Sequence, residues 1–94
     1  MEQKKSILII GRRWFESRNG NTYFSSITFI DGHPVSTIEC EYGYGDHYKE
    51  QSLLKIEREG LIPSRDGLDW YTWSEHHGYK IYSYAITVGR KKDL

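Results

Sequence analysis

The residues best suited to chemistry in this chain are arginines set beside aromatic rings in GRRWFESRNGNTY, residues 11–23. A guanidinium group forms charge-assisted hydrogen bonds to phosphate, and an aromatic ring stacks on a nucleobase. The segment therefore predicts contacts to an anionic, base-containing ligand. The alternative is that Trp14 or Phe15 is core and that the arginines pair with acids elsewhere. The predicted contacts are arginines for phosphate, rings for stacking and asparagines for a base or ribose edge: Arg12, Arg13, Arg18, Trp14, Tyr23, Asn19 and Asn21.

A second candidate is EYGYGDHY, residues 41–48, which leads into a predicted helix. Glycines before a helix N-terminus leave backbone N–H groups free for an anion. The alternative is a tight turn in which Asp46 caps the helix and its carboxylate repels phosphate, and no phosphate-loop lysine follows. Both interpretations stay open, because three tyrosines at positions 42, 44 and 48 cannot all enter a small core. The predicted contacts here are Gly43, Tyr44, Gly45, Asp46 and Tyr48.

Other chemistry has weaker support in the sequence. No serine or cysteine stands in a nucleophile motif, and the four histidines lack metal-ligand spacing. Cys40 falls in the apolar register of its predicted strand, so we expect it to be a small buried side chain. We therefore expect no catalytic residues, no metal and no cofactor.

The chain has 94 residues, which suits one domain spanning 1–94. So small a core favours association into a homo-oligomer. The longest apolar run is Ile7–Ile10, too short for a membrane span, and the single cysteine forbids an intrachain disulfide, so we expect a cytoplasmic protein. Net charge is zero but uneven: residues 1–30 carry +3, residues 31–77 carry −6 and residues 78–94 carry +3.

The periodicity predicts strands over 6–17, 22–30 and 35–42. Asn19-Gly20 predicts a tight hairpin turn between the first two, and Asp31-Gly32 a similar turn before the third. In the third strand, Ile38, Cys40 and Tyr42 are expected on one face. These three strands form an antiparallel meander.

After residue 42 the hydrophobic period becomes helical. Asp46 is a predicted N-cap, Tyr48, Leu53 and Ile56 share one face, and Gly60 ends the helix. Residues 69–77 are either a short helix capped by Asp69 or a hairpin, and we favour the helix. Residues 79–88 form the last strand. The prediction is a small α+β domain, β-β-β-α-(α)-β, in which pairing of the last strand near the first would join the Gly11–Trp14 and Gly89–Lys92 segments in one basic region.

Three motifs together resemble a group of small phage and prophage proteins without an assigned activity: GRRWFESRNGNTY near the start, YGYGDHY at the centre and RKKDL at the end. Phe24 departs from the pattern, which has histidine after Asn-Thr-Tyr. The resemblance covers most of the chain. It implies a phage-encoded protein acting in the bacterial host cytoplasm, where small non-enzymatic phage proteins often counteract host defence.

These observations give one hypothesis with two alternatives. The first is a non-catalytic homo-oligomer that sequesters a nucleotide-like ligand and so evades host defence. The second is a protein–protein inhibitor that presents an aromatic and acidic surface to a host defence protein. The third is a single-stranded nucleic-acid binder that uses the basic ends of the chain, against which the zero net charge argues.

Overall fold

The computed structural model describes residues 5–94 as four strands, two α-helices and one short 3₁₀ turn. The meander comprises β1 (Lys5–Glu16), β2 (Asn21–Ile30) and β3 (His33–Tyr42), as predicted. Two helices follow, α1 (His47–Arg58) and α2 (Trp70–His77), and then β4 (Tyr79–Val88) and η1 (Lys91–Asp93). The predicted α+β fold is confirmed.

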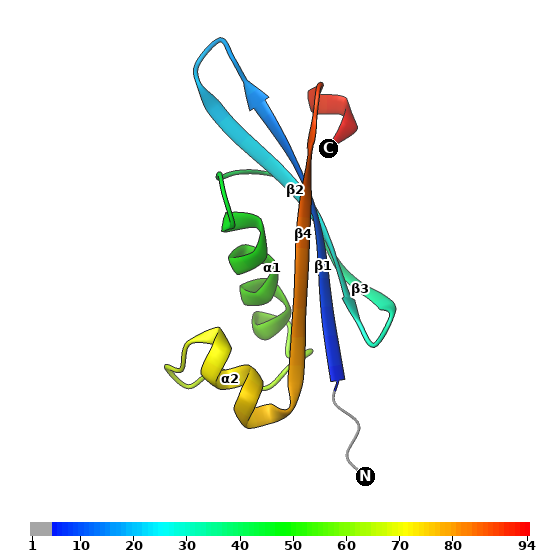
Figure 1. Ribbon diagram of the computed structural model, residues 1–94, viewed down its shortest axis with the longest axis vertical. Coiled ribbons are helices and arrows are strands. Elements are labelled where there is room, and N and C mark those ends of the chain that lie inside the picture. The colour runs from blue at the N-terminus through cyan, green and yellow to red at the C-terminus, as the bar shows by residue number, and fades with distance from the viewer. Residues whose placement is uncertain (1–4) are drawn as a thin grey trace.

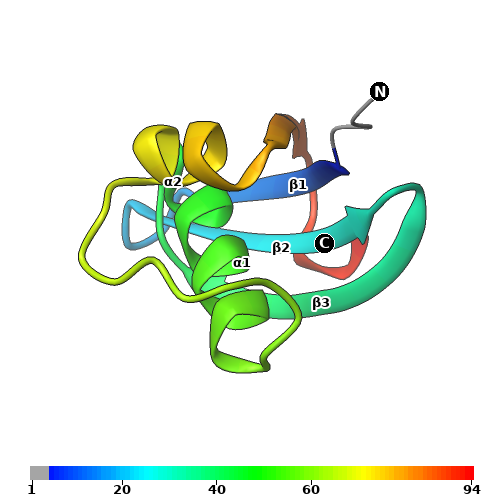
Figure 2. The same ribbon diagram turned by 90° about the horizontal axis from the view of Figure 1, so that it is seen from below.

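The four strands form a single sheet in the order β3-β2-β1-β4. The β1–β2 and β2–β3 pairs are antiparallel, whereas β4 runs parallel to β1 from the Lys5–Tyr79 pair to the Trp14–Val88 pair. Both α-helices pack on one face of this sheet (Figures 1 and 2), and the other face carries no α-helix of residues 5–94 but is met by the short η1 turn beside Arg12. Because β4 is parallel to β1, the end of the chain reaches the same end of the sheet as the β1–β2 hairpin (Figure 1).

The two predicted turns differ from each other. Asp31 and Gly32 both have positive φ, at 51° and 82°, as a two-residue hairpin turn requires. The hairpin turn predicted at Asn19-Gly20 is present, but only Gly20 has positive φ and the loop takes four residues, 17–20. A hydrogen bond from Gly20 N to Glu16 O, at 2.9 Å, closes this longer loop.

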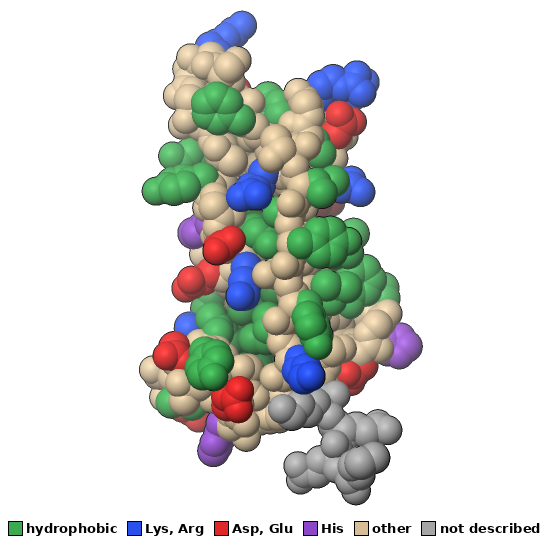
Figure 3. Space-filling model, viewed as in Figure 1, with side chains coloured by type: hydrophobic (Ala, Val, Ile, Leu, Met, Phe, Trp, Pro, Cys, Tyr) green, Lys and Arg blue, Asp and Glu red, His purple; other side chains and the backbone are tan. Residues whose placement is uncertain are grey.

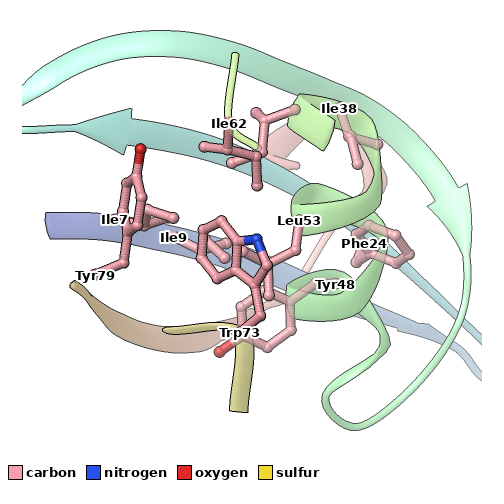
Figure 4. Packing of buried hydrophobic residues seen from close by; sticks show 10 residues of the cluster. Ile7, Ile9, Phe24, Ile38, Tyr48, Leu53, Ile62, Trp73 and Tyr79 are labelled. Carbon is pink, nitrogen blue, oxygen red and sulfur yellow. The ribbon is translucent and has the colours of Figure 1, made fainter. Parts of the chain in front are cut away.

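Alternation along β1 and β2 builds the core between sheet and helices. Ile7 and Ile9 point toward α1 and α2, and both are fully buried. Trp73 of α2 lies at the centre, stacked on Tyr79 with ring centroids 4.7 Å apart (Figure 4). The predicted apolar face of α1 is confirmed, since Tyr48, Leu53 and Ile56 are all buried. The cluster as a whole comprises Ile7, Ile9, Phe24, Ile38, Tyr48, Leu53, Ile56, Ile62, Trp73 and Tyr79.

Helix ends follow the sequence signals with one exception. Residues 70–77 are helical, as favoured, with the Asp69 carboxylate accepting from Thr72 N at 2.6 Å. That backbone hydrogen bond lowers the pKa of Asp69. Gly60 follows the last residues of α1 with φ of 75°, as an end-of-helix glycine should. Asp46 occupies the N-cap position of α1, but its side chain makes no capping hydrogen bond, which corrects the capping prediction.

The prediction for Cys40 was wrong, because its side chain is exposed. The reason is a β-bulge. Ser26 pairs with Ile38 and Phe24 pairs with Glu41, so β3 holds one residue more than β2 in this interval and the alternation is interrupted. Ile38 is buried under the helices, whereas Tyr42 projects to the other face beside Tyr23.

Gly11 lies where β1 passes beneath α1, and its lack of a side chain is required there. A Cβ at this position would stand 2.5 Å from Cδ2 of the buried Tyr48 ring. We expect Gly11→Ala to lower the free energy of unfolding by about 1–3 kcal/mol through overpacking. Chemical denaturation would measure the change.

The matched control is Gly89→Ala, since a Cβ at Gly89 would meet no atom within 4 Å. Equal stabilities for the two variants would show that α1 does not press on β1 at Gly11.

Candidate functional site

The face of the sheet that carries no α-helix, called here the open face, is unusually apolar for an exposed surface. The pairing register places Leu8, Ile10, Ile27 and Phe29 on it, opposite the buried side of β1 and β2. From β4 it receives Tyr82, Tyr84 and Ile86, which are 52%, 54% and 49% exposed. Figure 3 shows hydrophobic side chains gathered on the side of β4 that faces away from the helices. Such a surface is typical of a binding site.

Three rings form a continuous row across the open face near the β1–β2 hairpin, called here the aromatic row. Trp14 and Tyr23 are stacked with ring centroids 5.9 Å apart and planes inclined by 27°. Tyr42 meets Tyr23 edge to face, also at 5.9 Å. Trp14 and Tyr23 are half-buried, while Tyr42 is 60% exposed. The row therefore offers ring surface to a ligand without being sealed in the core.

Positive charge lies at the Trp14 end of the aromatic row. Arg12 lies on the open face, where its Nη1 donates to the carbonyl oxygen of Asp93 at 3.3 Å and ties the end of the chain to the sheet. The predicted meeting of the first and last basic segments is thus confirmed. Figure 3 shows lysine and arginine side chains at the end of the molecule where the hairpin and the last residues lie. The set called here the basic end is Arg12, Arg18, Arg90, Lys91 and Lys92.

Charge is separated between the basic end and the helical layer. Two acids, Glu16 and Asp93, lie within the same segments as the five positive residues of the basic end, and Arg90 pairs with Asp93 at 3.3 Å. Residues 46–77, which form the helical layer, hold seven acidic and four basic residues. The zero net charge therefore conceals a positive end and a negative layer.

The predicted contacts divide into two groups. Arg12, Trp14 and Tyr23 share the open face, and Asn21 joins them there because it pairs with Glu16 of β1. At the hairpin tip Arg18 is exposed, and Asn19 donates to a Glu16 carboxylate oxygen at 3.0 Å.

The other group lies on the helical side of the sheet. Arg13 points there and donates to the carbonyl oxygen of Gly45 at 3.3 Å. Gly43 is buried against the His47 ring, and a side chain at this position would collide with that ring. The glycine is therefore explained by packing. A hollow of about 470 Å³ adjoins this loop, but Asp46 and Glu50 line it and would repel a phosphate. This charge favours the interpretation of EYGYGDHY as a turn.

Tyr48 must be removed from the predicted contacts. Its side chain is 4% exposed and packs on the backbone of Gly11, so no ligand can stack on it. Tyr44, by contrast, is 75% exposed in the loop. The sequence reasoning missed Tyr42, Tyr82 and Tyr84 as candidate contacts. Tyr82 and Tyr84 alternate along β4 and so share one face, but the sequence does not show that this face lacks an α-helix.

Within residues 5–94 no three His, Cys, Asp or Glu side chains gather as a metal site would require, and neither described helix has the length and apolar character to cross a membrane. The chain matches no protein-family model, no curated protein and no solved structure.

Proposed function

We propose that this protein is a non-catalytic binding protein that holds a single-stranded nucleic acid on the aromatic row of its open face. The observation that carries the proposal is the stacked Trp14–Tyr23 pair, continued by the exposed Tyr42 ring and flanked by Arg12. Rings in series accept successive bases, and nearby guanidinium groups neutralise the phosphates between them.

The shape of the open face favours an extended ligand over a small nucleotide. Small-molecule sites are concave and enclose most of the ligand. The aromatic row instead crosses three neighbouring strands, β1, β2 and β3, with one ring from each strand at positions paired directly across the sheet. A strand of nucleic acid can follow such a row, whereas a free nucleotide would keep much of its surface in water. The separated charges also guide a polyanion to the basic end and away from the acidic helical layer.

The biological setting follows from the resemblance to phage and prophage proteins. In a bacterial host, a protein of this kind would counteract host defence by occupying the nucleic acid that the defence recognises. In the small-ligand version of this proposal, the same rings sequester a nucleotide signal instead of a strand of nucleic acid. A homo-oligomer would multiply the contacts to one strand and raise the affinity.

One observation favours a second candidate, the protein–protein inhibitor of a host factor. The helical layer is acidic, and Tyr71 of α2 is 76% exposed on it. An acidic surface with an exposed ring suits a basic protein partner. This candidate uses the opposite side of the molecule, so the two can be separated by experiment.

The test is fluorescence anisotropy with labelled homopolymeric DNA and RNA oligonucleotides, followed across a salt series. We expect binding that weakens with salt, with a log–log slope of about −0.7 for each phosphate neutralised. Absence of binding at low salt would contradict the proposal. A thermal shift with mononucleotides but no oligonucleotide binding would instead support the small-ligand version, and capture of a host protein that is lost on Tyr71→Ala would support the inhibitor.

A further inference from the structure

The two edges of the sheet differ in how well they are protected against pairing with another strand. The β3 edge carries Pro34, which has no N–H to donate, and two register shifts against β2. It also carries Glu39 and Glu41, both exposed. Proline, bulges and charges are the usual means of preventing edge-to-edge association.

The β4 edge has almost none of this protection. Its ten residues pair with β1 without a register shift and include no proline or glycine. Lys80 is its only charged residue. No further strand of residues 5–94 pairs with its outer side, since β4 ends the order β3-β2-β1-β4. The front of Figure 1 shows it running the length of the sheet with no helix across it. A long, regular, apolar edge is a template for strand addition.

We propose that β4 pairs antiparallel with β4 of a second copy of this chain, about a two-fold axis near Ser83. This inference does not depend on the proposed ligand. The register puts Ser83 opposite Ser83 of the second copy, Tyr82 opposite Tyr84, and Lys80 opposite Ile86. Residues directly opposite share a face, so every residue keeps its side of the sheet. The two open faces then become one continuous surface on an eight-stranded sheet.

Charge complementarity supports a second copy as the occupant of this edge. Within the pair no like charges face each other, because Lys80 lies near one end of the strand and meets Ile86. Beyond the strand ends, antiparallel pairing brings Arg90 of each copy toward the last turn of α2 in the other, where Glu75 is exposed. Arg90 of each copy thus comes near a carboxylate of the other copy across the two-fold axis.

The groove beside the edge is another surface that a second copy can reach. A hollow of about 460 Å³ lies there, lined among others by Tyr79 and Tyr82. Tyr82 is 52% exposed and flanks the edge from its open side. Burying this ring against a second copy stabilises a dimer of a chain whose own core is small.

Sedimentation under reducing conditions tests the proposal, and we expect a dimer at micromolar concentrations. Ile86→Lys places a charge opposite Lys80 of the second copy at two symmetric points, and should weaken dimerisation at least about tenfold. The matched control is Ile27→Lys, which adds the same charge to the same face on the interior strand β2 and should leave the dimer intact. A monomeric wild type would overturn the proposal. A dimer that is broken by Ile27→Lys but not by Ile86→Lys would also overturn it, because that result would indicate association through the open faces.

A second measurement covers the case in which Ile86→Lys fails to fold. Ser83→Cys in a Cys40→Ser background places two thiols at opposite positions, where the Cα separation of about 4.5–5.5 Å permits a disulfide. Mild oxidation should give a covalent dimer. Ile27→Cys in the same background should remain uncrosslinked. If Ser83→Cys and Ile27→Cys crosslink equally, β4 pairing is wrong.

Discussion

Replacing Trp73 by alanine is expected to lower the free energy of unfolding by about 3–5 kcal/mol, the range typical of a fully buried tryptophan. Trp73 has no exposed surface, and its ring stacks on Tyr79 while its Nε1 donates to the carbonyl oxygen of Pro63 at 3.0 Å. The substitution therefore leaves a cavity and also removes the hydrogen bond that holds the loop between the helices. Since a small domain has only about 5–15 kcal/mol of stability, this loss is a large fraction of the total and should clearly lower the midpoint of unfolding.

Thermal and chemical denaturation, followed by near-ultraviolet circular dichroism, would measure this loss. The matched control is Tyr71→Ala in the same helix, because the Tyr71 ring is 76% exposed and contributes little to the core. We expect that control to unfold within about 0.5 kcal/mol of the wild type. If Trp73→Ala were as stable as Tyr71→Ala, α2 would not be anchored to the sheet by its tryptophan.

The sequence predicted the elements well where its local signals agree with the tertiary structure. Asp31-Gly32 formed the expected turn because both residues tolerate positive φ. The helix over 70–77 formed where Asp69 could cap it and Gly78 could end it in the left-handed conformation. The last strand was predicted at its observed bounds, 79–88, because its alternation ran uninterrupted. Each of these features depends on residues close together in the chain.

The failures came from features that only the assembled sheet determines. The bulge that exposes Cys40 arises from how β3 aligns against β2, and regular alternation in the sequence conceals it. Asn19 does not take positive φ, because β1 ends at Glu16 and the hairpin uses four residues. Tyr48 is wrong as a ligand contact, because Gly11, distant in sequence, leaves space for its ring in the core.

The candidate site was predictable in composition but not in arrangement. Strand alternation alone places Arg12 and Arg13, neighbours in β1, on opposite faces, and the structure has them there. It could not say that Tyr42, from the third strand, would extend the Trp14–Tyr23 pair. Nor could it identify the face without an α-helix, because that depends on which side of the sheet the single connection from β3 to β4, with both α-helices, crosses. The strand order that joins the two basic segments became known only from the structure.

Replacing Trp14 by alanine is expected to weaken binding of a single-stranded oligonucleotide about tenfold to a hundredfold. Stacking of a base on an aromatic side chain is worth about 1–3 kcal/mol, and Trp14 is the largest ring of the aromatic row. Its loss should also free Tyr23 from its stacked partner, 5.9 Å away, and so loosen the second ring of the row. Fluorescence anisotropy at fixed low salt measures the affinity. The salt slope should stay near the wild-type value, because tryptophan neutralises no phosphate.

Two further variants separate stacking from charge and from general damage to the fold. Arg12→Gln should weaken binding and also reduce the salt slope by about 0.7, since it removes one phosphate contact. Tyr71→Ala removes a ring that is more exposed than Trp14 but lies on the acidic helical layer, and binding should be unchanged. If Tyr71→Ala weakens binding as much as Trp14→Ala does, the ligand does not select the open face. The proposed function would then fail even with the fold intact, because the argument for nucleic acid depends on this one face combining stacked rings with positive charge.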